Sequence, residues 1–282
     1  MLPALRAAAG CRVVAIASRD PARAGRLAEE HGIERVHRDY GDLLGDPDVD
    51  AVYLPLVNSL HREWTLRALA AGKHVLCEKP LAMSAAEGAE MASAAERAGR
   101  LLMEALMYRF HPRMRQLAAS LAGVPVRHLY ASFGFPLTVA ENYRLRAELG
   151  GGALLDVGCY VADAARWLLG EPESVAALVR REAVDVSWSA LLGFASGAQA
   201  SLFCSFESPE YQELVVVGAD RVVRVPTPFT AWRDPDDPYE LMVEAFARAA
   251  LEGSPAPLPP ESSLANLRLL DRIRQAGDGH AS

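Results

Sequence analysis

The sequence predicts an α/β chain in two parts, a doubly wound parallel sheet followed by an α+β unit with a mostly antiparallel sheet. Up to Tyr108, short apolar segments alternate with segments of helical pattern, which is typical of a parallel sheet. After Tyr108 most strand-like segments follow one another without helices between them, which is typical of an antiparallel or mixed sheet. A chain of 282 residues, 51% of them hydrophobic, is long enough for two cores. We therefore place one domain at residues 1–108 and a second at residues 109–282.

The first unit is expected to contain short strands and longer helices. An Ala-rich helix ends before Gly10, and Pro21 suits the first turn of the next helix. Ser84, with Glu87 three residues later, has the pattern of a helical capping box. The expected strands are apolar runs at residues 12–17, 50–55, 75–77 and 101–105. The expected helices lie at residues 1–9, 22–30 and 85–98, with another that ends at Ala71.

The second unit is dominated by strand-like segments. A helix at residues 152–169 interrupts them, and helices at 239–251 and 262–275 close the chain. The proline-rich residues 255–260 form a stiff spacer before the last helix. An exposed face of this sheet would suit a homodimer. The expected strands lie at residues 126–135, 174–181, 186–194, 199–206, 211–217 and 221–225.

Composition limits the classes of partner. With 36 acidic and 29 basic residues the net charge is −7, which argues against a general binder of nucleic acid or of anionic membranes. No apolar run approaches the length that spans a membrane. The four cysteines lie far apart without a CxxC pair, so neither a metal site nor a disulfide framework is indicated. A cytoplasmic protein with a small-molecule partner is expected.

The tripeptide Glu78-Lys79-Pro80 is the first candidate for chemistry. It directly follows the apolar strand at residues 75–77, and ligands of open α/β sheets bind at the carboxyl ends of the strands. Pro80 restricts the backbone of Lys79, so the ammonium would be held at a defined place. The alternative is an ordinary charged pair at the end of a strand, and the tripeptide alone favours that alternative.

Three sequence blocks, taken together, identify a family. The chain resembles the Gfo/Idh/MocA family of nicotinamide-dependent oxidoreductases, close to its glucose-fructose oxidoreductase, xylose dehydrogenase and dihydrodiol dehydrogenase branch. The resemblance covers nearly the whole chain and implies a Rossmann-like first domain. Each block alone would be weak, but three in the right order are specific. The blocks are residues 71–80 (AGKHVLCEKP), 103–112 (MEALMYRFHP) and 150–160 (GGGALLDVGCY).

The resemblance implies three catalytic residues. Lys79 would lie beside the nicotinamide and the substrate oxygen, and Tyr160, which replaces a histidine of many members, would exchange a proton with that oxygen. A phenol is a weak acid unless a nearby cation lowers its pKa, and Lys79 is expected to be that cation. Asp156 and Tyr160 are four residues apart, so both would lie on one helix face, with Asp156 accepting substrate hydroxyl groups. The alternative is that Tyr160 belongs to the core and that Asp156 only begins the helix.

The cofactor is expected to be NADP, with NAD possible. Ser18 and Arg19 follow the strand at residues 12–17, where NAD-preferring folds place an acidic residue, and an arginine suits a 2′-phosphate instead. Asp20, directly after them, keeps NAD open. The resemblance also places Asn58, His61 and the Glu78-Lys79-Pro80 tripeptide at the cofactor site, although His61 is equally typical of a helix surface.

Glu104 and Arg109 are candidates for the substrate side, with Asp156. Glu104 ends the last strand of the first domain and would face the cleft, unless it forms an ion pair at the junction. Arg109 begins a basic run that would meet an anionic group of a substrate, although a solvated helix face is the more typical role for such a run. The expected activity is hydride transfer between NADP(H) and a sugar or related cyclic polyol or carbonyl compound.

The start of the chain differs from the family pattern. Family members begin with a strand and a GxGxxG turn whose amides receive the cofactor pyrophosphate, and Met1 to Leu5 correspond to the middle of the helix that follows. One explanation is a start codon placed too late, with roughly 20 residues missing. The other is a cofactor-deficient, non-catalytic ligand-binding or regulatory homologue. We favour the misplaced start, because the catalytic set is complete.

The printed chain is accordingly predicted to bind nicotinamide cofactor weakly. The amides that would hold the pyrophosphate precede Met1 in this interpretation, and the pyrophosphate carries the fixed charge of the cofactor. Calorimetric titration with NADPH of the 282-residue chain and of a form extended upstream checks this. Tight binding by the shorter form would contradict it.

Overall fold

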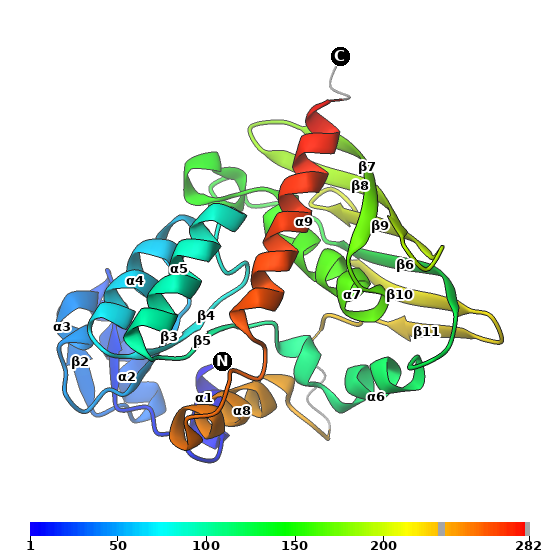
Figure 1. Cartoon of the computed structure of the whole chain (residues 1–282). Coiled ribbons are helices and arrows are strands. Elements are labelled where there is room, and N and C mark those ends of the chain that lie inside the picture. Colours follow the sequence, from blue (N-terminus) through cyan, green and yellow to red (C-terminus); the bar gives the residue numbers. More distant parts are fainter. Residues whose placement is uncertain (231–234, 280–282) are drawn as a thin grey trace.

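The computed structural model describes residues 1–230 and 235–279 and contains two units, one around each group of sheets. Figure 1 shows them side by side, with the long C-terminal helix α9 (Pro260–Asp278) between them. The sheets of the N-terminal unit are entirely parallel, and a larger mixed sheet forms the C-terminal unit. The predicted fold class is therefore confirmed.

The N-terminal unit has two groups of parallel strands. β1 (Ala15–Ala17) pairs with β2 (Arg35–His37), and β3 (Ala51–Leu54), β4 (His74–Cys77) and β5 (Leu102–Glu104) form a three-stranded sheet in that order. Within the described residues β1 and β3 are not hydrogen-bonded neighbours. β4 is the central strand of its sheet, which explains why its side chains are almost fully buried.

Helices of this unit begin where the sequence indicates. The side chain of Asp20 caps α2, which starts at a proline, and Ser84 caps α5 by accepting a hydrogen bond from the amide of Glu87 at 3.3 Å. Figure 1 shows α4 and α5 on the same side of the β3–β5 sheet. The helices are α1 (Leu2–Ala7), α2 (Pro21–His31), α3 (Tyr40–Leu44), α4 (His61–Ala70) and α5 (Ala85–Ala98), with the 3-10 turn η1 (Asn58–Leu60) before α4.

The C-terminal unit is one six-stranded sheet. Its strand order is β11-β10-β6-β9-β8-β7, in which β6 and β9 are parallel and all other neighbours are antiparallel. The sheet is thus mixed, as the succession of strands predicts. Its members are β6 (Val126–Gly134), β7 (Pro172–Arg181), β8 (Asp185–Phe194), β9 (Gln199–Ser205), β10 (Tyr211–Gly218) and β11 (Val222–Pro226).

Short helical turns and three further helices complete this unit. The predicted helix at residues 152–169 is divided into a π-helical turn, η5, and the α-helix α7, which packs on β6 and β9. π-helical turns are frequent at functional sites. The elements are η2 (Met107–Phe110), α6 (Pro112–Ser120), η3 (Tyr143–Leu145), η4 (Ala147–Leu149), η5 (Leu154–Gly158), α7 (Cys159–Leu169) and α8 (Pro238–Glu252).

Helix α9 joins the two units. It contacts α5 and β5 of the N-terminal unit and α7 and β7 of the C-terminal unit. The approach to α5 is close because Gly88 has no side chain: a Cβ atom there would lie 2.7 Å from Leu267 Cδ1 and 2.9 Å from Leu264 Cδ2. α8 likewise returns to the N-terminal unit and packs on α1. The C-terminal helices therefore contribute to both units.

The two faces of the six-stranded sheet differ. One face packs on α7 and carries buried residues such as Leu129 and Leu214. The strand register places Leu191, Tyr130 and Val215 in one row of the opposite face. Four large hydrophobic side chains on that face are exposed, namely Leu178, Leu191, Tyr211 and Val222.

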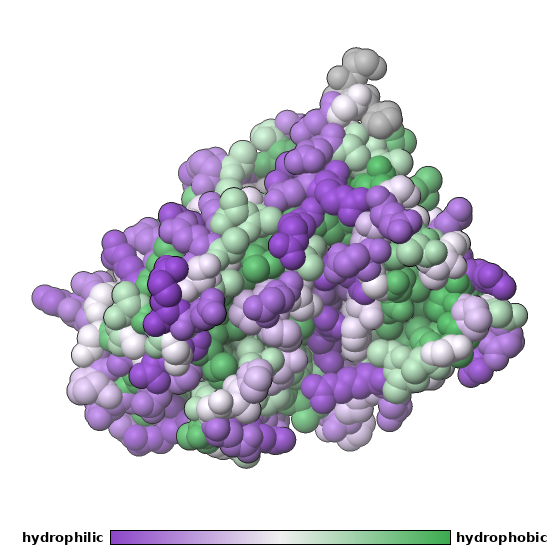
Figure 2. Space-filling view, in the orientation of Figure 1, coloured by the Kyte–Doolittle hydropathy of each residue, from purple (hydrophilic) through white to green (hydrophobic). Residues whose placement is uncertain are grey.

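The surface of the view in Figure 2 separates by hydropathy. The outer sides of α4, α5 and α9 are mostly hydrophilic, as expected for amphipathic helices on a core. Apolar surface lies at the right, where Figure 1 has β6, β10 and β11. Among the described residues no helix is both long and apolar enough to cross a membrane.

We predict that Gly88→Val lowers the free energy of unfolding by about 1–3 kcal/mol, because the added side chain must displace the packed Leu264 and Leu267 side chains of α9. Gly25→Val is the matched control, since a Cβ at that helix position has no neighbour within 4 Å. Its expected change is within about 0.5 kcal/mol. Urea unfolding of both variants checks this, and equal stabilities would contradict the packing argument.

Candidate active site

Lys79 lies at the carboxyl end of β4 and points toward the C-terminal unit. Its ammonium donates to the backbone oxygen of Asp156 at 2.7 Å and to Asp156 Oδ1 at 2.9 Å. Only 14% of the Lys79 side chain is exposed. The Lys79–Pro80 peptide bond is cis. The predicted strand-end lysine is thus held against the predicted helix-start aspartate.

Asp156 is a buried carboxylate between two cations. It lies in the π-helical turn η5, with 6% of its side chain exposed, and Arg144 Nε donates to its Oδ2 at 2.7 Å. Burial alone would raise the pKa of Asp156, but the charges of Lys79 and Arg144 outweigh it and the pKa is lowered. Burial also opposes the charge of Lys79, yet Asp156 raises the pKa of that ammonium well above its ordinary value. All three groups are charged at neutral pH.

Tyr160 lies beside Lys79, as its four-residue spacing from Asp156 predicts. The Lys79 ammonium is 5.2 Å from the centroid of the Tyr160 ring. The ring packs against aromatic neighbours, with centroids 5.9 Å away for Tyr108 and 5.5 Å away for both Phe133 and Phe229.

Two opposing effects set the pKa of the Tyr160 phenol. Burial raises the pKa of its phenol well above the ordinary value, and the charge of Lys79 lowers the pKa only in part. Lys79 therefore lowers the pKa of this phenol, as expected, but desolvation of the ring is the larger effect. The phenol is therefore protonated at neutral pH.

The residues on either side of Lys79 are fixed by neighbours. Glu78 accepts a short hydrogen bond from the hydroxyl of Tyr53 on β3, and burial raises the pKa of that hydroxyl. The carbonyl oxygen of Pro80 lies 2.8 Å from Nδ1 of His61. Glu78 and Pro80 are thus part of a network that joins the ends of β3 and β4.

His61 and Asn58 are buried in this structure. The ring of His61 is completely buried between the carbonyl oxygens of Pro80 and Leu56, the latter 3.0 Å from Nε2, and burial lowers the pKa of the ring. Asn58 donates through Nδ2 to the carbonyl oxygen of Gly150 at 2.7 Å. Both side chains connect backbone segments and neither lies in an open cleft.

Ser18 and Arg19 lie where the sequence places them, directly after β1. The hydroxyl of Ser18 accepts a hydrogen bond from the amide of Asp20 at 3.1 Å, which shapes the turn into α2. Arg19 is exposed and makes no ion pair with the described residues. Its guanidinium is therefore accessible at the carboxyl end of a parallel strand.

Glu104 is turned inward and is not open to a cleft. It is 2% exposed, and its Oε1 accepts a hydrogen bond from the amide of Leu81 at 2.9 Å. Burial raises the pKa of Glu104 to about 7, with a further contribution from the negative charge of Asp163. The hydroxyl of Ser263, the amide of Leu81 and the charge of Lys79 act in the opposite direction.

Arg109 belongs to a buried network at the junction of the units. Its Nε lies 3.2 Å from Asp163 Oδ2, and its guanidinium carbon lies 4.3 Å from the ring centroid of Trp167. Asp163 also accepts a short hydrogen bond from the hydroxyl of Tyr108. With 12% of its side chain exposed, Arg109 differs from a residue of a solvated basic face. Its ion pair is distinct from the one that Lys79 forms.

Two residues of the cluster are not indicated by sequence patterns, Arg144 and Tyr53. Arg144 lies in the turn η3 before the glycine run, and its carbonyl oxygen accepts from the amide of Gly152 at 2.9 Å. A Cβ atom on Gly151 would lie 2.4 Å from that carbonyl oxygen, so the second glycine allows the approach. The glycine run is the one feature of the sequence that indicates close packing of another backbone segment, here that of Arg144, against residues 150–152.

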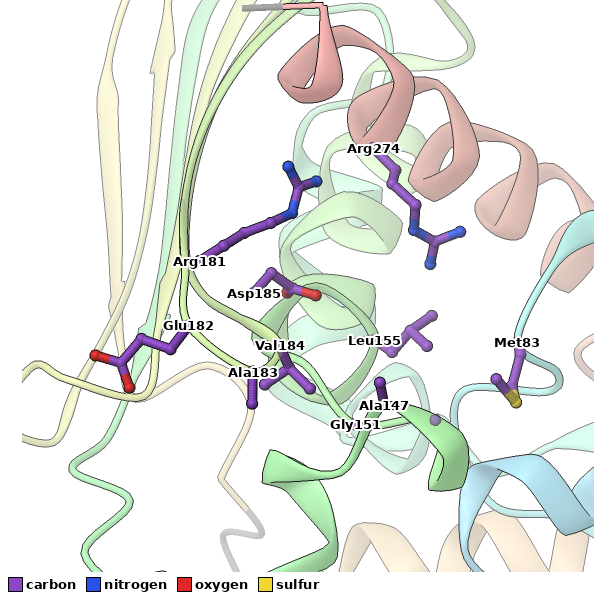
Figure 3. A pocket seen from close by; sticks show the side chains of 11 residues that line it. Met83, Ala147, Gly151, Leu155, Arg181, Glu182, Ala183, Val184, Asp185 and Arg274 are labelled. Atoms are coloured by element: carbon purple, nitrogen blue, oxygen red, sulfur yellow. The ribbon is translucent and has the colours of Figure 1, made fainter. Parts of the chain in front are cut away.

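A cavity of about 300 Å³ lies between the β7–β8 turn, α9 and the glycine run (Figure 3). The three predicted catalytic side chains are not part of its lining. Its two arginines have acidic partners, since Arg274 contacts Asp271 at 3.0 Å and Arg181 forms an ion pair with Asp278. We therefore assign the cavity no part in the chemistry. Within residues 1–230 and 235–279, no three His, Cys, Asp or Glu side chains form a cluster fit for a metal ion.

Both units match one family. Residues 1–106 match the family described as "Oxidoreductase family, NAD-binding Rossmann fold", and residues 111–224 match the "GFO/IDH/MocA C-terminal domain". The D-xylose 1-dehydrogenase (NADP(+)) 2 of Haloferax volcanii is 39% identical over 308 residues, which cover 100% of this chain and 94% of that protein. The resemblance stated from the three sequence blocks is therefore confirmed.

Solved structures agree with the fold. The crystal structure of aldose-aldose oxidoreductase from Caulobacter crescentus, complexed with glycerol, has a TM-score of 0.92 at 28% identity and covers 99% of this chain and 93% of the other. The 3-ketoreductase KijD10 of Actinomadura kijaniata, in complex with NADP and TDP-benzene, has a TM-score of 0.86 at 35% identity and covers 98% and 92%. Similarity at this level extends over both units.

The raised pKa of Glu104 predicts a pH-dependent stability. The carboxyl of Glu104 has a pKa of about 7 in the folded chain and an ordinary pKa in the unfolded chain. Its stabilisation of the fold is complete at pH values below the pKa of the unfolded chain and is lost as the pH rises to 7. We expect a contribution on the order of 2–3 kcal/mol. Urea unfolding from pH 4.5 to 8 should show the loss in the parent chain and a flatter curve in Glu104→Gln. The exposed-site variant Glu96→Gln is the control, and parallel curves for the parent and Glu104→Gln would contradict the prediction.

Proposed function

Because this chain belongs to the GFO/IDH/MocA family of oxidoreductases, we propose that it transfers a hydride between NADP(H) and a sugar or related cyclic polyol or carbonyl compound. The observation that carries the proposal is the cluster of Lys79, Asp156 and Tyr160 at the carboxyl end of β4. Relatives named as an NADP xylose dehydrogenase and a 3-ketoreductase support the cofactor and substrate class. They do not favour a non-catalytic ligand-binding role.

The residues present fit two parts of a nicotinamide dinucleotide, the nicotinamide and the 2′-phosphate. Glu78 and Lys79 lie at the carboxyl end of β4, and the accessible guanidinium of Arg19 lies at the carboxyl end of β1. Carboxyl ends of parallel strands are where such ligands bind. Arg19, with Ser18 beside it, would hold the 2′-phosphate of NADP, since a guanidinium pairs well with a phosphate. The bound nicotinamide would supply hydride chemistry at its C4 atom.

Tyr160 and Lys79 have different roles in the proton transfer. In the direction of carbonyl reduction, the protonated phenol of Tyr160 donates its proton to the substrate oxygen that gains a hydrogen. The ammonium of Lys79 polarises the same oxygen and stabilises the phenolate that remains. In the oxidation direction the phenolate takes the proton back.

Asp156 holds Lys79 in place and orients the substrate. Its two oxygens accept from Lys79 and Arg144, and a carboxylate oxygen retains a lone pair for a substrate hydroxyl. For Asn58 and His61 we propose support of the loops around the cofactor, since both are buried and bonded to backbone groups. For Arg109 the buried pair with Asp163 favours a structural role over direct contact with the substrate.

We also propose a role for each domain, an oligomeric state and a cellular location. Residues 1–108 would hold the cofactor, and residues 109–282 would hold the substrate and form a homodimer. The exposed face of the six-stranded sheet, with Leu178 and Leu191, supports a second copy of this chain as its partner. The free thiols of the four cysteines support a reducing, cytoplasmic location.

Replacing Lys79 by methionine tests the proposed function. We expect kcat to fall at least about 10²-fold, because the charge that stabilises the reacting oxygen is lost. Asp156 keeps Arg144 as a partner, so the chain should still fold. Lys79→Arg is the matched control, which retains the charge and should retain the fold but not the full rate. Steady-state assays at saturating NADPH with a panel of aldoses and ketosugars give the values, and unchanged turnover of Lys79→Met would remove Lys79 from the mechanism.

Replacing Arg19 by aspartate tests the cofactor preference. The change should shift the ratio of kcat/KM from NADP toward NAD, because the new carboxylate repels the 2′-phosphate and can accept from a 2′-hydroxyl. A shift of at least about tenfold is expected for the loss of one phosphate pair. Arg23→Asp, one turn into α2, is the control for a general charge effect. Equal shifts in both variants would show that Arg19 does not read the phosphate.

A further inference from the structure

We propose that Glu104 is a positioning residue for Lys79, which fixes the turn Lys79–Leu81 through the Leu81 amide and connects that turn to α9 through Ser263. The inference rests on the proposed function, in which Lys79 acts on the reacting oxygen. It assigns Glu104 no contact with substrate or cofactor. It also gives α9 a part in the geometry of the site.

The strand register brings Glu104 to the turn. Glu104 ends β5 and pairs with Cys77, which ends β4, and the amide of Ala105 donates to the carbonyl oxygen of Cys77 at 2.7 Å. From this position Glu104 Oε1 reaches the amide of Leu81 at 2.9 Å. The side chain thus holds the backbone two residues beyond Lys79.

The turn is held at three successive points. The amide of Lys79 donates to Glu78 Oε2 at 3.2 Å, the carbonyl oxygen of Pro80 lies 2.8 Å from His61 Nδ1, and the amide of Leu81 donates to Glu104. Glu104 is the member of this set that comes from β5, the strand next to β4. Removal of the Glu104 side chain would free the end of the turn nearest α5. The backbone of Lys79, and with it the ammonium, would then no longer be held in one position.

The side chain of Glu104 interacts with Ser263 on α9. Oε2 is buried and makes no hydrogen bond of good geometry with the described residues, and the same is true of the hydroxyl of Ser263 on α9. The hydroxyl of Ser263 nevertheless stabilises the carboxylate charge. Two buried polar atoms that lack other partners, one on β5 and one on α9, are best satisfied by each other. A buried carboxyl in this place is costly, which favours a specific role over packing.

The charges around Glu104 link its ionisation to Lys79. Lys79 on the turn stabilises the carboxylate, and Asp163 on α7 destabilises it. The buried thiols of Cys77 on β4 and Cys159 on α7 also face it. When Glu104 is ionised, its hydrogen bond from Leu81 is charge-assisted and stronger. Turnover should therefore increase as the pH rises through about 7.

Two substitutions separate the hydrogen bond from the charge. Glu104→Gln keeps an oxygen for the Leu81 amide, so kcat at its optimum should stay within about threefold, but the step in the pH profile of kcat near neutral pH should disappear. Glu104→Leu removes both, and kcat should fall at least about tenfold while KM for NADPH changes less than about twofold. Ser263→Ala should shift the step to higher pH. Glu96→Gln is the control and should match the parent chain.

The outcomes separate this inference from the proposed function. Parent-like kcat in a folded Glu104→Leu, with Lys79→Met inactive, would overturn the positioning role and leave the proposed function intact. Full activity of Lys79→Met would overturn the proposed function itself. If Glu104→Leu does not fold, Glu104→Gln decides, and a pH profile identical to that of the parent chain would overturn the inference. Loss of NADPH binding in Glu104→Gln would indicate direct contact with the cofactor and would also overturn it.

Discussion

The structure of the site depends on one desolvated carboxylate, that of Asp156. Its burial would keep it neutral, and two cations from separate segments hold it charged. Lys79 comes from the end of β4 and Arg144 from the turn before the glycine run, so this one group connects both units of the chain. The requirement for two cations explains why a strand end, a loop and a helix start converge here.

The order of strands and helices was predictable from the sequence, because most elements carry strong periodic or capping signals. α5, for example, runs over the predicted residues 85–98 with its predicted cap. β2 (Arg35–His37) was not predicted, since three residues with polar ends give no apolar run. α3 is likewise only five residues long, too short for a helical period.

The site was predictable where chemistry and spacing coincide. The position of Lys79 at a strand end, and of Asp156 and Tyr160 on one helix face, follows from local pattern. Their catalytic roles were implied only by the resemblance to the family. Arg144 does not, because a loop arginine has no periodic position. The inward orientation of Glu104 and His61 depends on α9 and on the ends of neighbouring strands, which only tertiary packing brings near. Desolvation of Tyr160 is likewise a property of the assembled aromatic group.

Helix α9 has a thermodynamic consequence. One continuous helix contacts the strands and helices of both units, so neither unit can open widely without breaking contacts made by the other. Small domains joined by a short linker often unfold in separate steps, whereas units that share a helix form one cooperative block. Amide hydrogens of α5 and of α7 should then exchange through the same global opening. Helix α9 therefore makes the stability of the N-terminal unit and that of the C-terminal unit a single quantity.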